Sequence, residues 1–101
     1  MGKTKTKAEK QHLSKVASIG CIACNQLGFF GSPAEIHHCR EGQGIGQRAS
    51  NFDVIPLCRA HHRGTDHPRT ASIHMDKRNF IAQFGTELEL LERTRQELGI
   101  N

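Results

Sequence analysis

The chain has 101 residues, a net charge of +4 and a hydrophobic fraction of only 36%, without Trp or Tyr. A domain of this size buries a small core, so metal ions or a partner commonly add to its stability. The basic charge suits a polyanion, and equally suits simple solubility. The N-terminus has no signal-peptide pattern, and no apolar run approaches the length of a membrane span. We therefore predict one cytoplasmic domain over residues 1–101, with residues 1–6 as a flexible basic arm.

The N-terminal part of the chain predicts a helix and then a loop. Thr6 and Glu9 have the spacing of a capping box, which marks a helix start. Apolar residues at helical spacing extend this helix over about residues 7–19, and Gly20 can end it. Residues 25–33 contain two Gly and a Pro, which indicates a loop.

Two short strands are predicted in the middle of the chain, over residues 34–38 and 53–57. Between them lies a Gly-rich polar stretch at 41–50, and a long loop in a small domain is commonly functional. Pro56 lacks the N–H that a central strand would use, so the second strand lies at an edge, or ends there.

The C-terminal part predicts two helices. The first covers about residues 75–84 and stops at Gly85. A second capping box at Thr86 starts the other, over residues 87–98. Its expected apolar face contains Leu88, Leu91 and Leu98, widened by Leu90. Helices combined with two strands give an α+β fold class.

Cysteine and histidine spacing predicts a structural zinc site. A C-x2-C motif and a C-x2-H motif are separated by 33 residues; the four residues are Cys21, Cys24, Cys58 and His61. Four such ligands in two knuckles suit a closed tetrahedral Zn²⁺ site. The alternative is a redox-active C-x-x-C pair, which needs a strand before the motif and a helix after it. Here a helix precedes the motif, which disfavours that alternative.

A histidine pair forms the second candidate site. His37 and His38 are neighbours on a predicted strand, so their side chains point to opposite faces. One can hold a metal ion while the other takes a proton from water. Both could instead be ordinary surface residues, but a second pair at His61 and His62 favours the catalytic interpretation.

The segments IHHCREGQGIGQRAS, VIPLCRAHHRG and SIH carry a family resemblance. The chain resembles the HNH (ββα-metal) nucleases and, over nearly its whole length, the phage recombination-enhancement nucleases that depend on RecA. The resemblance implies a small ββα-metal module with a structural zinc knuckle and flanking helices. It also implies metal-dependent hydrolysis of DNA phosphodiesters in recombination, with DNA and a RecA–DNA filament as partners.

The resemblance also implies roles for individual residues. His37 and His62 would bind a catalytic Mg²⁺, Mn²⁺ or Zn²⁺ ion, and His38 would be the general base. The third ligand would be His74, with His67 as the alternative.

Two residues lie near the usual place of the middle Asn of the HNH motif. That position holds Asp53, and Asn51 lies two residues earlier. We expect Asp53 to orient His38 by accepting its Nδ1–H. Cys39 is expected to be a small buried residue.

DNA contacts are expected from side chains that flank the catalytic pair: Arg40, Gln47 and Arg48. Two other functions remain open at this point. One is a non-catalytic zinc-finger module that binds nucleic acid. The other is a restriction or homing nuclease of the HNH class that acts without RecA.

Overall fold

The computed structural model describes residues 5–40, 50–64 and 70–99. Its elements, in chain order, are α1 (Lys7–Ser18), α2 (Ile22–Gln26), β1 (Glu35–His38), β2 (Val54–Leu57), α3 (Arg59–His62), α4 (Lys77–Phe84) and α5 (Glu87–Leu98). The two strands pair in an antiparallel sheet. The predicted α+β class is therefore confirmed.

The start of α1 is fixed by the predicted capping box. The Thr6 side chain accepts a hydrogen bond from the Glu9 N–H, and the Glu9 carboxylate accepts one from the Thr6 N–H. The helix ends at Ser18, one residue earlier than expected. Gly20 then adopts a φ of +80°, and a Cβ there would lie 3.3 Å from the Ser32 carbonyl oxygen. This turn therefore favours glycine.

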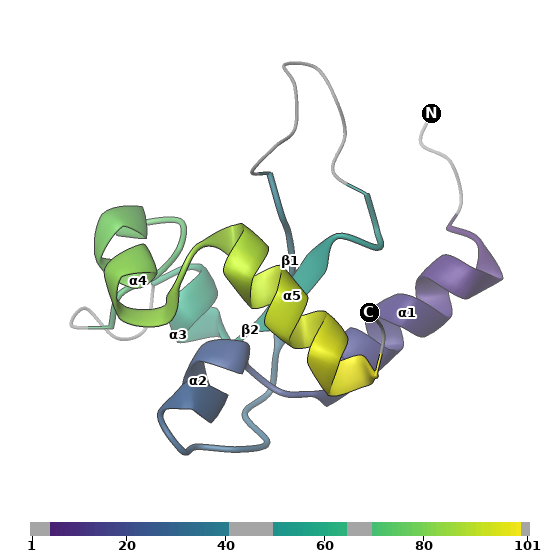
Figure 1. Cartoon of the computed structure of the whole chain (residues 1–101), viewed down its shortest axis with the longest axis horizontal. Helices are drawn as coiled ribbons and strands as arrows, with labels where there is room; N and C mark the ends of the chain where they lie inside the picture. Colours follow the sequence, from purple (N-terminus) through teal and green to yellow (C-terminus); the bar gives the residue numbers. More distant parts are fainter. Residues whose placement is uncertain (1–4, 41–49, 65–69, 100–101) are drawn as a thin grey trace.

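The β1–β2 hairpin forms the centre of the fold (Figure 1). His37 pairs with Ile55, and His38 pairs with Val54. All four residues of β2 are buried, because α1, α2 and α5 pack against this strand. Pro56 is tolerated because β2 pairs with only one strand in the described part of the chain.

A small apolar core surrounds β2. Side chains from the hairpin and from four helices form this core. The largest of these side chains are Phe80, Ile22, Ile55, Leu57 and Leu90. No helix in the described part of the chain is long and apolar enough to cross a membrane.

The face that α5 turns inward differs from the expected one. The boundaries are as predicted, but Leu88 is 50% exposed and Glu87 is only 3% exposed. The buried residues of the helix are Glu87, Leu90, Leu91 and Thr94, which follow the i, i+3, i+4, i+7 spacing of one helical face. The helix is thus rotated to place a carboxylate inside the protein.

Two short helices were not predicted. Residues 25 and 26, expected in a loop, belong to α2, and α3 follows Cys58 directly. Each helix is four or five residues long, too short to show a hydrophobic period. Helix α4 begins at Lys77 rather than near residue 75, after Asp76 as its N-cap residue.

Candidate active site and zinc site

The two predicted knuckles come together into one cluster. The four ligand atoms of Cys21, Cys24, Cys58 and His61 all lie within 4.8 Å of one another. His61 Nδ1 is 3.2 Å from Cys58 Sγ and 3.5 Å from Cys24 Sγ. Cys24 Sγ is 3.7 Å from Cys58 Sγ. Because Cys21 precedes α2 and Cys58 precedes α3, the cluster joins the starts of two helices.

This donor set fits a zinc ion. Zn–S bonds of about 2.3 Å and Zn–N bonds of about 2.0 Å put tetrahedral ligand atoms roughly 3.5–3.8 Å apart, close to the separations in the cluster. Burial raises the pKa of the Cys21 thiol to about 12, and the neighbouring Cys58 and Cys24 thiols add to this effect. The raised pKa favours the neutral thiol in the absence of metal, whereas the separations allow the site to hold a metal ion such as zinc, whose charge would stabilise the thiolates.

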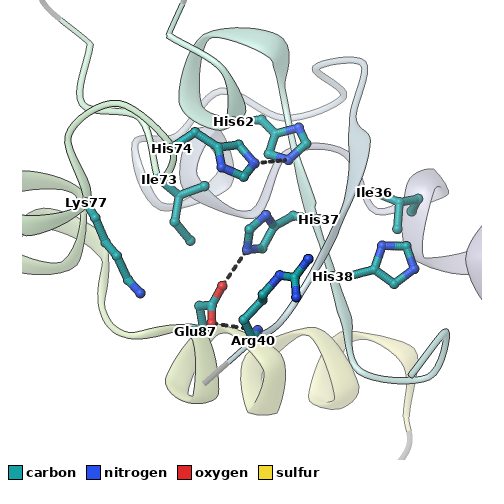
Figure 2. A pocket seen from close by; sticks show the side chains of 9 residues that line it. All are labelled: Ile36, His37, His38, Arg40, His62, Ile73, His74, Lys77 and Glu87. Carbon is teal, nitrogen blue, oxygen red and sulfur yellow. Dashed lines mark hydrogen bonds and ion pairs between the residues drawn. The ribbon is translucent and has the colours of Figure 1, made fainter. Parts of the chain in front are cut away.

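Three other histidines converge in a second cluster. The ligand atoms of His37 on β1, His62 on α3 and His74 before α4 lie within 4.8 Å of one another. The Nε2 atoms of His62 and His74 are 3.0 Å apart. Figure 2 shows His37 between this pair and Glu87. Burial lowers the pKa of both His37 and His74, which favours the neutral imidazole that binds metals.

A carboxylate sets the orientation of His62. Its Nδ1 lies 2.8 Å from Glu35 Oε1, and Arg63 holds the same carboxylate through Nε and Nη2. The hydrogen bond to His62 is the main cause that lowers the pKa of Glu35, so this carboxylate is ionised and can only accept. His62 therefore donates from Nδ1, and its Nε2 lone pair faces His74.

Glu87 orients His37 in a similar way, but it contacts Nε2 of the ring rather than Nδ1. Its Oε2 lies 2.5 Å from His37 Nε2, and its Oε1 accepts a hydrogen bond from the Arg40 backbone N–H at 2.9 Å. A proton on Nε2 leaves the Nδ1 lone pair of His37 for a ligand. Histidines that bind a metal commonly donate their other N–H to a carboxylate in this way.

His38 has a separate set of partners. Its Nε2 is 2.8 Å from Asn51 Oδ1, and Asn51 Nδ2 donates to Glu9 Oε2 at 2.8 Å. The side chain points away from His37, as the strand pattern predicted (Figure 2). His38 nevertheless lines the same cavity as the three-histidine cluster.

The residue that contacts His38 is Asn51 and not Asp53, which differs from the expectation. Asp53 Oδ1 instead pairs with Arg95 Nη2 at 2.6 Å, and Asn51 contacts His38 through the ring's Nε2 rather than Nδ1. Asp53 lies next to β2, where its side chain reaches α5, whereas Asn51 lies in the turn that faces α1. Cys39 is buried, as predicted, and lies in neither ligand cluster.

The cavity beside the histidines has a volume of about 510 Å³ and is open to solvent. Arg40 and Lys77 supply positive charge at its lining. Of the side chains expected to contact DNA, Gln47 and Arg48 lie outside the described residues, as does His67.

Residues 5–99 match the model of one protein family, described as recombination enhancement, RecA-dependent nuclease. The chain belongs to this family. The match covers nearly the whole chain and includes every residue of the two clusters. A comparison with curated proteins found no match.

Membership assigns nuclease activity in recombination, with DNA as substrate and a link to RecA. In this RecA-dependent nuclease, the structure brings together residues that the sequence analysis did not single out for the site: Glu9, Glu35, Lys77 and Glu87. Glu35 was detectable, because it precedes His37 by two positions and so shares its strand face. The other three become neighbours of the site only through tertiary folding.

Proposed function

We propose that the chain is a metal-dependent endonuclease of the HNH, or ββα-metal, class. One observation carries the proposal: three histidines converge, two of them fixed by carboxylates, in a cavity that a separately oriented fourth histidine also lines. The order β1, β2, α3 agrees with a ββα module. Together with the family, this arrangement supports hydrolysis of DNA phosphodiesters guided by RecA.

His38 is the proposed general base. Its Nε2 proton is donated to Asn51, so the Nδ1 lone pair is available to accept a proton. A water molecule gives a proton to His38 Nδ1 as the water oxygen attacks phosphorus, and the bond between phosphorus and the 3′ oxygen breaks. The leaving oxygen takes a proton from solvent. The products carry 5′-phosphate and 3′-hydroxyl ends.

His37, His62 and His74 are the proposed ligands of a catalytic Mg²⁺, Mn²⁺ or Zn²⁺ ion. When bound, such an ion neutralises charge on the phosphate and on the leaving oxygen. Glu35 and Glu87 keep the ligand nitrogens of His62 and His37 unprotonated. The separation of 3.0 Å between the Nε2 atoms of His62 and His74 is compatible with two nitrogens on one ion.

Arg40 and Lys77 are the proposed phosphate contacts among the described residues. Both line the cavity, and both side chains are exposed to solvent. A guanidinium group can bind two phosphate oxygens at once, whereas an ammonium group acts as a compact charge. Arg48 and Gln47, which lie outside the described residues, are further proposed contacts with DNA.

A zinc-loading experiment separates this proposal from a non-catalytic zinc module. We expect native mass spectrometry to show two zinc ions on the wild-type chain and one on His62→Ala, since an imidazole-rich site also holds Zn²⁺. His12→Ala is the matched control. His12 lies outside both clusters and packs against Phe52, so this variant should keep two ions. A single ion on the wild type would instead support the binding module.

A further inference from the structure

Glu9 is committed to two structural elements at once. Its Oε1 accepts the Thr6 N–H at 2.9 Å and so closes the capping box of α1. Its Oε2 accepts the Asn51 Nδ2–H at 2.8 Å, across 42 positions of sequence. The capping box therefore holds the carboxylate in place, and the second oxygen ties the first turn of α1 to the turn before β2.

The carboxylate dictates which way the Asn51 amide faces. Hydrogen bonds from the Thr6 backbone and then from the Asn51 side chain lower the pKa of Glu9, so it stays ionised and can only accept. Asn51 must therefore turn its NH₂ group to Glu9 and its oxygen to His38. That oxygen can only accept, so the proton of a neutral His38 ring resides on Nε2.

We propose that Glu9 is a positioning residue, which fixes the Nε2–H tautomer of His38 through Asn51. The proposal rests on the role of His38 as the base in the proposed function. With the proton held on Nε2, the lone pair is always on Nδ1, the nitrogen that takes the proton from water. Helix α1, which contributes none of the proposed ligands, thus contributes to the chemistry.

Glu9→Gln is the informative variant. Glutamine has the same shape, but it presents one acceptor and one donor to two donors, the Thr6 N–H and the Asn51 NH₂. If the glutamine oxygen stays on the Thr6 N–H, its NH₂ group faces Asn51, and the Asn51 amide turns over and presents its own NH₂ group to His38. If the oxygen faces Asn51 instead, the capping bond to Thr6 is lost. The His38 ring is therefore no longer held in the Nε2–H form alone. Glu89→Gln is the matched control. Glu89 closes the same kind of capping box with Thr86 on α5, and the hydrogen bonds described for its side chain reach only Thr86.

The test combines side-chain ¹⁵N NMR of the zinc-loaded protein with single-turnover DNA cleavage. We expect wild type and Glu89→Gln to show His38 as the Nε2–H tautomer. Glu9→Gln should show a mixture or the Nδ1–H form. Its cleavage rate should fall about 10- to 100-fold, the size of effect that is usual for partners that orient metal-binding histidines. Zinc content and DNA affinity should not change.

A wild-type tautomer in Glu9→Gln would overturn the inference, and so would equal rate losses in Glu9→Gln and Glu89→Gln. Failure of the proposed function gives a different result. In that case His38→Ala would cut DNA like the wild type, while the NMR measurement would still show whether Glu9 sets the tautomer.

Discussion

His38→Ala should lower the rate of DNA cleavage by about 10²–10⁴, the usual contribution of a general base. Metal content and DNA affinity should stay close to those of the wild type. The reason is that His38 contacts Asn51 and belongs to neither ligand cluster. Cleavage under single-turnover conditions, together with bound metal measured by mass spectrometry, checks this prediction.

His37→Ala is the natural comparison, because His37 is next to His38 in sequence but belongs to the cluster of three histidines. This variant should bind the catalytic ion weakly, and excess Mn²⁺ should partly restore its activity. If His38→Ala loses metal while His37→Ala keeps it, the two roles are exchanged. If both variants cut like the wild type, the reaction does not occur at this pair.

Cys58→Ser should abolish cooperative unfolding or make the protein insoluble. Cys58 is the N-cap residue of α3, and its sulfur lies 3.2 Å from His61 Nδ1 within the four-ligand cluster. Structural zinc contributes an apparent binding free energy of about 10–16 kcal/mol in small zinc domains, which is comparable to the whole stability of a typical domain, about 5–15 kcal/mol. Loss of one ligand thus removes much of what holds α2 and α3 in place.

Cys39→Ala is the control for this experiment. It removes a buried thiol that lies outside the cluster, so the variant should keep its zinc and unfold cooperatively. Thermal unfolding followed by circular dichroism, with zinc measured on the same samples, distinguishes the two variants. A Cys58→Ser protein with wild-type melting and zinc content would contradict the structural role of the cluster.

Local patterns were sufficient to predict the elements whose determinants are close in sequence. The capping boxes at Thr6 and Thr86 predicted the starts of α1 and α5, because the bonds concerned join residues three apart. Successive side chains of a strand point to opposite faces, so the sequence also predicted that the neighbours His37 and His38 face opposite ways. The two C-x2-C/H knuckles predicted a cluster because each knuckle fixes two ligands locally.

Features that depend on tertiary packing could not be predicted in this way. Glu87 rather than Leu88 lies on the inner face of α5, where its carboxylate contacts His37 and the Arg40 N–H. Asp53 and Asn51 both lie near the expected position, and their contacts with Arg95 and His38 depend on how the turn packs against α5 and α1. No local sequence pattern distinguishes Glu87 from Leu88 as the buried residue, or Asn51 from Asp53 as the partner of His38.

Cleavage of a RecA-paired D-loop by the wild type and by His62→Ala tests most directly whether the three-histidine cavity is the site of the reaction. We expect the wild type to cut this substrate with Mg²⁺ or Mn²⁺, to stop on chelation, and to leave plain duplex largely intact. His62→Ala should lose most of this activity while keeping its structural zinc. Wild-type cleavage by a folded His62→Ala would place the reaction elsewhere, and activity that persists after chelation would contradict its dependence on a metal ion.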